Sequence, residues 1–183
     1  MKTVIGIVGM PGSGKTTMSQ CAKEKDWEIV VMGDVVREET SERGLELTPS
    51  NVGKTMLDLR REEGPGVIAK RCVEKIIKSD SEGVIVEGIR SLDELNLFRQ
   101  SLPNFILIAI HASPETRFTR LFNRGRSDDP KNRKIFFERD LRELEVDIGS
   151  AIAMADRVIS NEGSLSDFCL KVKNLLKKIS ELS

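Results

Sequence analysis

The sequence predicts a three-layer α/β/α fold in which helices cover both faces of a five-stranded parallel sheet. Short apolar runs, rich in Val and Ile, alternate with longer segments of helical spacing along the chain. The runs lack the polar alternation that marks a strand exposed on one face, so we expect both faces of the sheet to be buried. The chain has 183 residues, and residues 1–183 are predicted to form one domain with a complete hydrophobic core.

Five segments have the length and composition of buried strands. Each is short, apolar and rich in β-branched residues. The predicted strands are residues 3–8, 28–32, 83–87, 105–110 and 157–160. Strands that alternate with helices form parallel pairs with right-handed crossovers, and ligands of such sheets bind beyond the carboxyl ends of the strands. Functional residues are therefore expected at that edge.

Eight segments with helical spacing lie between the strands and after them. The predicted helices are residues 15–25, 33–43, 50–62, 66–79, 91–100, 114–124, 131–148 and 164–181. Two connections are longer than a single crossover helix needs. Residues 33–82 are predicted to form a helical insertion, and the polar, basic residues 122–135 are predicted to form a short lid.

Residues 9–16 read Gly-Met-Pro-Gly-Ser-Gly-Lys-Thr and directly follow the first predicted strand. This is the P-loop pattern, and its place between a strand and a helix predicts a P-loop NTPase fold. The glycines let backbone N–H groups point at a phosphate, and the following helix adds its positive N-terminal end. Lys15 is predicted to reach the β- and γ-phosphates of ATP as a catalytic residue, and the Thr16 hydroxyl is predicted to ligate Mg²⁺. The residues predicted to bind the nucleotide here are Gly9, Met10, Pro11, Gly12, Ser13, Gly14, Lys15, Thr16 and Thr17.

The segment after the second predicted strand brings Asp34 and Arg37 to the carboxyl edge of the sheet, where a helix begins. Asp34 is predicted either to cap that helix or to act near an acceptor, because a short carboxylate suits both roles. Arg37 lies one turn further along and would point back at an anion. The alternative for Arg37 is a solvated surface charge.

The segment after the third predicted strand reads Glu87-Gly88-Ile89-Arg90. An acidic residue that ends a strand beside the P-loop strand is suited to hold Mg²⁺, and we predict that Glu87 does so through water. Gly88 would let a substrate approach the backbone, and Arg90 is predicted to bind a phosphate with its planar guanidinium group. The alternative for Glu87 is a solvent-facing charge at the strand end.

Residues 117–142 contain nine Lys or Arg residues and four Asp or Glu residues. Arg117, Arg120 and Arg124 are three and four residues apart, so they share one face of the predicted helix. A cationic surface of this kind stabilises the charge on a transferred phosphoryl group, and a mobile lid excludes water from it. The alternatives are a solvated basic helix or a patch that binds nucleic acid.

The charge balance argues against a polyelectrolyte partner. The chain has 29 basic and 29 acidic residues, so neither nucleic acid nor a membrane is predicted to bind it. No apolar run approaches the roughly 20 residues of a membrane-spanning helix, and no signal peptide precedes the first strand. Cys21, Cys72 and Cys169 are far apart and lie in apolar contexts, which predicts buried, reduced thiols in a cytoplasmic protein.

These motifs make the chain resemble nucleoside monophosphate kinases of the adenylate kinase type. More narrowly, the whole chain is similar to an archaeal family of P-loop proteins described as adenylate kinase-like or dephospho-CoA kinase-like. The markers, in order along the chain, are GMPGSGKT, MGDVVREE, EGIRS, RLFNRGRSDD and ADRVISNEG. The resemblance implies a kinase that uses ATP and Mg²⁺ to phosphorylate a small molecule, with residues 33–82 as the acceptor-binding insertion.

The resemblance also implies roles for individual residues. Arg120 and Arg124 match catalytic lid arginines, and Arg90 matches a catalytic arginine that binds the acceptor phosphate. Asn161 and Gly163, together with Arg120, would line the pocket for ATP. The residues implied to contact the acceptor are Asp34, Arg37, Glu87, Gly88, Arg90, Arg126 and Arg139.

The acceptor itself stays open between two kinds of molecule. A monophosphate acceptor needs arginines, and Arg37 and Arg90 favour a nucleoside monophosphate kinase. A hydroxyl acceptor benefits from a general base, and Asp34 matches a carboxylate that dephospho-CoA kinases use near the acceptor hydroxyl. A third hypothesis is a regulatory P-loop ATPase that acts through an RNA or protein partner. GTP is the alternative donor, and the chain is predicted to act as a monomer or homodimer.

Overall fold

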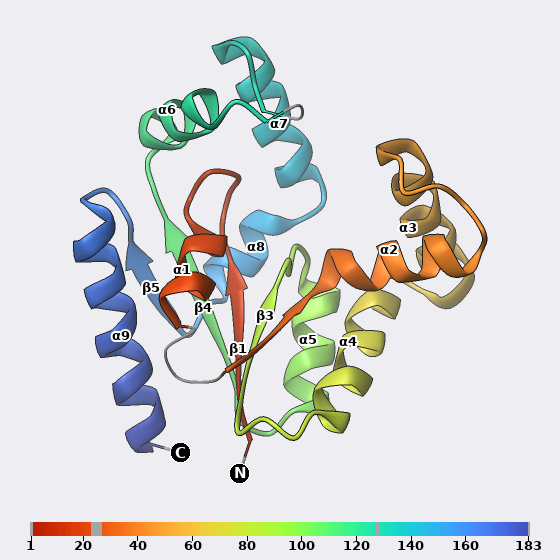
Figure 1. Ribbon diagram of the computed structural model, residues 1–183, viewed down its shortest axis with the longest axis horizontal. Coiled ribbons are helices and arrows are strands. Elements are labelled where there is room, and N and C mark those ends of the chain that lie inside the picture. Colours follow the sequence, from red (N-terminus) through yellow and green to blue (C-terminus); the bar gives the residue numbers. More distant parts are fainter. Residues whose placement is uncertain (1, 23–26, 127–128, 183) are drawn as a thin grey trace.

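A five-stranded parallel sheet forms the central layer of the protein, in the strand order β2-β3-β1-β4-β5 (Figure 1). The computed structural model describes residues 2–22, 27–126 and 129–182. The strands are β1 (Thr3–Val8), β2 (Glu28–Val31), β3 (Gly83–Glu87), β4 (Phe105–His111) and β5 (Arg157–Ser160). All of them lie within one residue of their predicted bounds, so the prediction of a parallel α/β sheet is confirmed.

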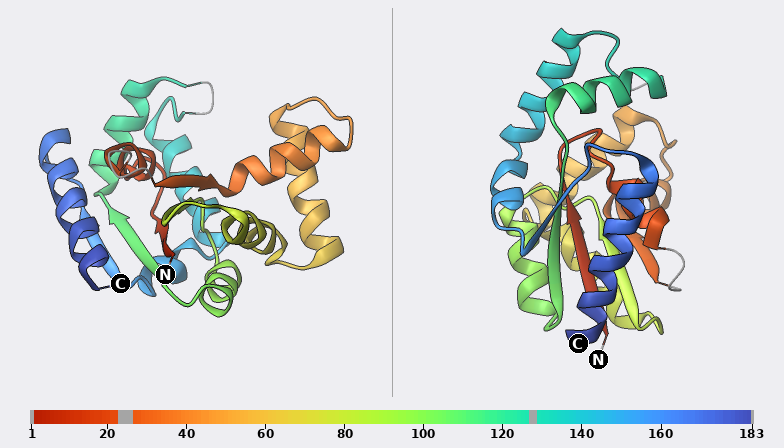
Figure 2. Two further views of the ribbon diagram at one scale, coloured as in Figure 1. Left: turned by 60° about the horizontal axis from the view of Figure 1, so that its bottom comes forward. Right: turned by 90° about the vertical axis from the view of Figure 1, so that its left-hand side faces the viewer.

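Helices cover both faces of this sheet, as predicted for a three-layer fold. They are α1 (Lys15–Ala22), α2 (Met32–Glu42), α3 (Pro49–Glu63), α4 (Val67–Lys78), α5 (Leu92–Ser101), α6 (Pro114–Arg124), α7 (Arg133–Glu145), α8 (Ile148–Ala153) and α9 (Leu165–Leu182). The helices α1 and α9 pack on one face, and α4, α5 and α8 pack on the other (Figure 2). In the described part of the chain, no helix is both long enough and apolar enough to cross a membrane.

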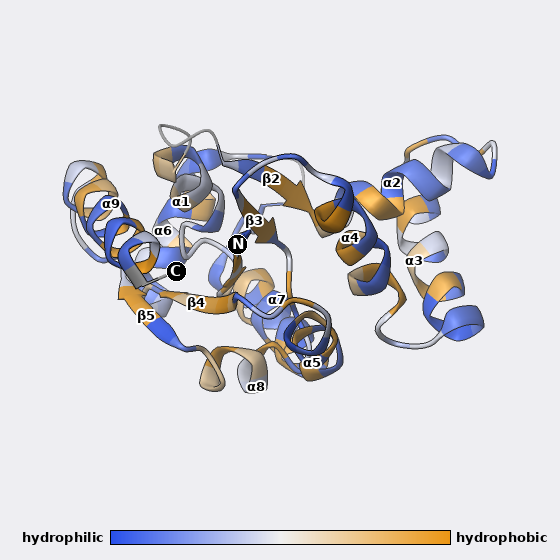
Figure 3. Ribbon diagram, turned by 90° about the horizontal axis from the view of Figure 1, so that it is seen from below, coloured by the Kyte–Doolittle hydropathy of each residue, from blue (hydrophilic) through white to orange (hydrophobic). Residues whose placement is uncertain are grey.

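The two apolar cores follow from the alternation of side chains along the strands. In β1, Val4 and Val8 contribute to the core beneath α4, α5 and α8, whereas Ile5 and Ile7 contribute to the core beneath α1 and α9. Successive strand residues point to opposite faces, so a continuous apolar run fills both layers. Figure 3 accordingly shows hydrophobic strands between amphipathic helices.

The predicted insertion, residues 33–82, contains α2, α3 and α4. The helix α4 is part of the core, because Ala69, Cys72 and Ile76 are fully buried. It therefore serves as the crossover helix that leads to β3. The helices α2 and α3 are the part of this segment that projects from the sheet (Figure 2).

One helix prediction differs from the structure, and the end of another cannot be compared with it. The predicted helix 131–148 is two helices, because α7 ends at Glu145 and Asp147 adopts a left-handed conformation with φ 73°. The chain turns there so that Ile148 and Ala151 can be buried against the sheet. The last three residues of the predicted helix 15–25 lie outside the described residues. Capping by Asp34 is also wrong, because α2 begins at Met32 and Asp34 lies inside its first turn.

The prediction of three reduced cysteines is wrong for two of them. Cys21 of α1 and Cys169 of α9 form a disulfide, with their Cα atoms 5.3 Å apart. They are 148 residues apart in sequence, and only the packing of α1 against α9 brings them together. Cys72 is free and buried, and burial raises the pKa of its thiol to about 12.

Candidate active site

The P-loop connects β1 to α1 at the carboxyl edge of the sheet. Its backbone requires glycine at two positions, because Gly12 has φ 82° and Gly14 has φ 108°. A Cβ atom on Gly14 would also lie 2.2 Å from Nδ2 of Asn161. The glycines that make the motif are thus needed both for the curl of the loop and for its packing.

Lys15 folds back over the loop that precedes it. Its ammonium group donates to the carbonyl oxygens of Gly9, at 2.6 Å, and Met10, at 3.2 Å. Burial, and then the positive charge of Arg90, lower the pKa of Lys15 from 10.5 to about 8. A bound triphosphate would replace these two carbonyls as the partner of the ammonium group.

Thr16 and Glu87 lie side by side, as their predicted role requires. The parallel register pairs Glu87 with Ile7 of β1, so the carboxylate stands next to the P-loop. The Thr16 hydroxyl lies 3.4 Å from Oε2 of Glu87. Hydroxyl and carboxylate oxygens are the ligands that Mg²⁺ prefers, and Mg²⁺ usually keeps several waters and binds substrate phosphates as well. These two residues therefore fit a magnesium ion held between protein and nucleotide.

Asn161 joins the β5–α9 connection to the P-loop. Its amide nitrogen donates to the carbonyl of Ser13 at 2.8 Å, and its amide oxygen accepts from Nη2 of Arg120 at 3.3 Å. Arg120 and Asn161, both predicted to bind ATP, are therefore brought together beside the loop. Within the described structure, Nη1 of Arg120 is buried and has no hydrogen-bond partner. Gly163 follows two residues after Asn161 and packs near Asp167 instead.

Arg117 has a structural position that the sequence did not predict for it. The residue is 4% exposed, and its side chain forms a bidentate ion pair with Asp140 of α7, at 2.8 and 2.6 Å. Its guanidinium group also donates to the carbonyls of Pro11 and Ala112, each at 3.2 Å. One buried residue thus links the P-loop, α6 and α7. The helical spacing identified its face, but no pattern in the sequence identified Asp140 as its partner.

A buried carboxylate, that of Asp129, interacts with three arginines that the sequence placed in or near the lid. Asp129, with its side chain 2% exposed, accepts from Nε of Arg124 at 2.8 Å and from the backbone N–H of Arg126 at 3.0 Å. Nη1 of Arg139 lies 3.7 Å from the same carboxylate. The Arg124 guanidinium group holds the pKa of Asp129 below its usual value. Residues 127 and 128 of the predicted lid lie outside the described residues.

A hollow of about 360 Å³ lies where the β3–α5 connection faces α7, within the size range of small-molecule pockets. It is lined by Arg90, Arg139, Arg142, Glu143 and Val146. Nη1 of Arg90 lies 3.7 Å from Oε1 of Glu143. The sequence prediction included Arg90 and Arg139 and missed Arg142 and Glu143. Their spacing places them on the face of α7 that carries Arg139, but only the fold shows which face lines a cavity.

Asp34 and Arg37 form a separate pair on α2. Nη2 of Arg37 lies 3.2 Å from Oδ1 of Asp34, and each side chain is about half exposed. Gly88, with φ 107°, packs against Met32 at the start of the same helix. In the part of the chain that the structure describes, no ion pair joins Asp34 or Arg37 to the residues of the hollow.

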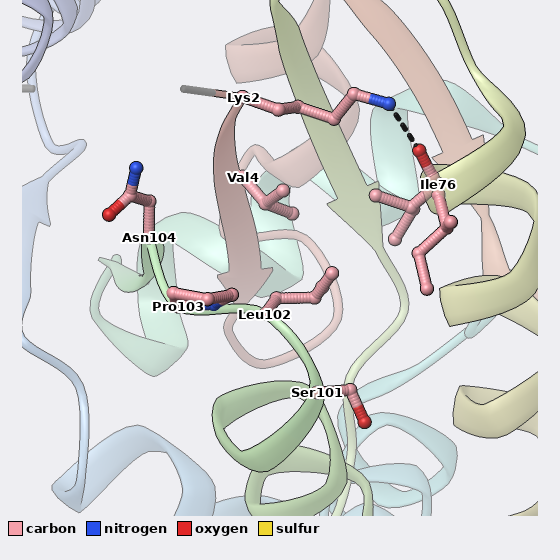
Figure 4. Close-up of a pocket in the computed structure, with 8 residues that line it drawn as sticks. Lys2, Val4, Ile76, Ser101, Leu102, Pro103 and Asn104 are labelled. Atoms are coloured by element: carbon pink, nitrogen blue, oxygen red, sulfur yellow. Dashed lines mark hydrogen bonds between the residues drawn. The ribbon is translucent and has the colours of Figure 1, made fainter.

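A second hollow, of about 250 Å³, lies at the opposite end of the sheet (Figure 4). Its lining includes Val4, Leu102 and Asn104, near the starts of β1 and β4. Lys2 reaches across to donate to the carbonyl of Ile76 at 2.5 Å. No predicted site residue lines this hollow, and it stands apart from the carboxyl edge where the P-loop lies.

Comparison with known families locates the P-loop within a recognised domain. A family model described as an AAA domain matches residues 8–134. The match starts at the end of β1, includes the P-loop and the helices α1 to α6, and covers more than half of the chain.

Curated relatives match nearly the whole chain. A UPF0200 protein of Methanocaldococcus jannaschii is 54% identical over 178 residues, which cover 96% of this chain and 90% of the relative. A UPF0200 protein of Thermococcus kodakarensis is 44% identical over 180 residues, which cover 96% of this chain and 97% of the relative. These names state no activity.

Solved structures share the fold over nearly its full length. A protein from Thermus thermophilus has a TM-score of 0.67 at 18% identity, with 97% of both chains covered. Shikimate kinase from Acinetobacter baumannii has a TM-score of 0.61 at 16% identity, with 97% of this chain and 94% of that chain covered. A gluconokinase from Sinorhizobium meliloti has a TM-score of 0.58 at 15% identity, with 98% and 95% covered. The chain therefore has the α/β fold of P-loop kinases.

Proposed function

The chain belongs to the AAA domain family and to the UPF0200 proteins, and from this premise we propose that it is a kinase that transfers the γ-phosphoryl group of Mg-ATP to a small anionic acceptor. One observation carries the proposal: charged residues that line the hollow of about 360 Å³ also act on the P-loop lysine. Among the groups whose charges act on Lys15 are Arg90, Glu143 and Arg139, all of which line the hollow. A donor phosphate at Lys15 would therefore lie close to an anion in the hollow.

The residues of this cleft suit the chemistry of phosphoryl transfer. The transition state is loose, and its charge is spread over the equatorial oxygens of the γ-phosphoryl group, so positioned cations supply most of the catalysis. Lys15 and the P-loop N–H groups would hold the phosphates, and the buried Nη1 of Arg120 would donate to them. Thr16 and Glu87 would hold Mg²⁺, which neutralises phosphate charge when bound.

The acceptor that this site favours is a nucleoside monophosphate. Such an acceptor presents a phosphate oxygen as nucleophile, and Arg90 and Arg139 would hold that phosphate while α7 covers it. Two structural neighbours are named as shikimate kinase and gluconokinase, so the fold also serves small acceptors of other kinds. We therefore treat the acceptor class as the part of the proposal to be tested first.

A second candidate is phosphorylation of a hydroxyl group, as in dephospho-CoA kinases. The observation that favours it is the position of Asp34, which is about half exposed at the carboxyl edge of the sheet and is paired with the partly exposed Arg37. A carboxylate in that position would accept the proton of an acceptor hydroxyl. Replacing Asp34 by Asn would then lower kcat strongly while acceptor affinity is unchanged.

The direct test is a matrix of donors and acceptors. Purified protein with Mg-ATP or Mg-GTP would meet AMP, CMP, UMP, GMP, their deoxy forms and dephospho-CoA, and the phosphorylated acceptor would be measured. We expect one nucleoside monophosphate to turn over at about 1 per second or faster, an ordinary enzyme rate. ADP release without any phosphorylated acceptor would overturn the kinase and favour a regulatory ATPase. Stimulation of that release by RNA or a protein would then identify its partner.

A further inference from the structure

The helix α7 carries an apolar stripe that stays about half exposed. Phe137, Leu141 and Leu144 are 65%, 50% and 49% exposed. They are four and three residues apart, so they share one face of the helix. The right-hand view of Figure 2 shows α7 along the outer edge of the molecule. Large apolar side chains that gather on one exposed face mark an interaction surface, whereas scattered ones need no explanation.

The stripe serves neither the core nor the proposed active site. Phe136 is 4% exposed and packs edge-on against Phe118 of α6, with the ring centroids 5.6 Å apart. Glu143 lines the hollow of about 360 Å³. Phe136 and Glu143 are seven residues apart, so they mark the face of α7 that points toward the rest of the molecule. The stripe lies on another face, and a partner bound there would leave the hollow open.

Two charged residues border the stripe, and each lies at the end of α7 that disfavours its charge. Lys134 is in the first turn and Glu145 is in the last turn. The helix dipole favours the opposite arrangement, with acidic residues at the start and basic residues at the end. Both side chains are exposed, and neither forms an ion pair with any described residue. The helical repeat places both on the same edge of the stripe.

We propose that α7 pairs with α7 of a second copy of this chain, antiparallel and about a two-fold axis. In that arrangement Leu141 lies near the axis, and Phe137 faces Leu144 of the second copy. The same register brings Lys134 opposite Glu145 of the second copy, and the symmetry makes each of these contacts twice. The antiparallel neighbour thus supplies the opposite charge at each end of α7, which a parallel neighbour would not. The inference goes beyond the proposed function and does not depend on it.

The size of the stripe predicts a weak dimer. The helix α7 has 13 residues, so it is about 20 Å long. One helix face of that length is smaller than the roughly 800 Å² that each partner buries in an interface of standard size. The charge pairs at the rim set the direction of pairing more than its strength. We therefore expect a reversible dimer with a dissociation constant of about 10–100 µM.

Sedimentation velocity on the full chain measures this association. Between about 1 and 500 µM the wild type is expected to shift from monomer to dimer by mass action. Leu141→Glu places two carboxylates together near the axis and is expected to weaken the dimer at least about 100-fold. The matched control is Leu170→Glu, which makes the same change at a residue of α9 that is 59% exposed. The control is expected to leave the dissociation constant unchanged.

Charge reversal tests the direction of pairing without changing the stripe. Lys134→Glu and Glu145→Lys, made singly, turn both attractive pairs into repulsive ones, and each is expected to weaken the dimer about tenfold at low salt. The double variant restores both pairs with their signs exchanged. It is expected to return the dissociation constant to within about threefold of the wild type. Because both positions are exposed, circular dichroism is expected to show the wild-type fold in all three variants.

Each outcome decides the proposal. A wild type that stays monomeric at the highest concentration would overturn it and leave the stripe to a different partner. A dimer that Leu141→Glu does not weaken would overturn it as well, because the contact would lie elsewhere on the molecule. A dimer that the double variant fails to restore would overturn the antiparallel arrangement. Loss in Leu141→Glu, weakening in each single reversal and recovery in the double variant would together support it.

Discussion

The proposed donor side and the proposed acceptor side of the site are built differently. On the donor side, Arg117 and Asn161 are 4% and 6% exposed, and each contacts a P-loop carbonyl. On the acceptor side, Arg37 and Arg90 are about half exposed and pair with carboxylates at 3.2 and 3.7 Å. Buried, closely paired groups keep their geometry without a ligand, whereas exposed pairs exchange readily with water. The proposed donor site is thus preorganised, and the proposed acceptor site would be completed by its ligand.

The largest effect is expected from breaking the buried pair of the donor side. Asp140→Asn leaves Arg117 buried with an uncompensated charge, so the free energy of unfolding should fall by about 3–5 kcal/mol. Urea denaturation would measure it. The matched control is Glu115→Gln, which breaks a pair with Arg133 that is largely exposed and should cost less than about 1 kcal/mol. Equal losses in the two variants would remove the distinction between buried and exposed pairs.

The next largest effect concerns the P-loop lysine. Lys15→Ala removes the ammonium group that would neutralise the transferred phosphoryl group, so kcat/KM should fall by about 10²–10³-fold. Lys178→Ala, at an exposed position of α9, is the control of equal charge. Activity that survives the loss of Lys15 would contradict any role for the P-loop in turnover.

The lowered pKa of Lys15 predicts a pH dependence that belongs to the donor side alone. Below about pH 8 the group is already protonated, so ATP affinity should not change through it. Above pH 8 the lysine must take up a proton to meet the phosphates, so affinity should fall about tenfold per pH unit until the pKa in the complex is reached. Fluorescent-nucleotide titrations between pH 7 and 10 would measure this. A flat profile would show that the ammonium group does not gain its proton on binding.

The smallest effect on stability is expected on the acceptor side. Arg37→Gln breaks a half-exposed pair, so the free energy of unfolding should change by less than about 1 kcal/mol. If Arg37 contacts the acceptor phosphate, as the resemblance implies, acceptor KM should nevertheless rise about tenfold while ATP affinity stays constant. A rise in the ATP dissociation constant instead would assign Arg37 to the donor site and would contradict the division of residues between the two sites.

Sequence reasoning found the local patterns of the chain and missed the contacts between distant segments. The strands and the P-loop are local patterns, in which residue type and spacing already contain the physics, and they were predicted to within a residue or two. Arg117, Arg120 and Arg124 show the limit of such patterns. They share one helix face, yet their partners are Asp140, Asn161 and Asp129, and each partner belongs to another element.

The missed residues depend on contacts between distant segments. In the sequence, Arg142 and Glu143 look like ordinary surface charges of a helix. Only the packing of α7 near Arg90 of the β3–α5 connection shows that they line a hollow. The disulfide joins helices at opposite ends of the chain, and the apolar residues around each cysteine did not indicate that the two would pair. Asp34 has the right residue type for a cap, but α2 begins three residues earlier than that role allows.

The disulfide also gives the chain an uneven topology. Cys21 and Cys169 close a covalent ring that carries β2, β3, β4 and β5, whereas β1 and the P-loop lie on the open tail before Cys21. The middle strand of the sheet is therefore supplied from outside the ring and inserts between β3 and β4. The ring closes through α1, the helix that directly follows the nucleotide loop, so the disulfide ties that helix to the last helix of the chain. A non-reducing gel reports this closure.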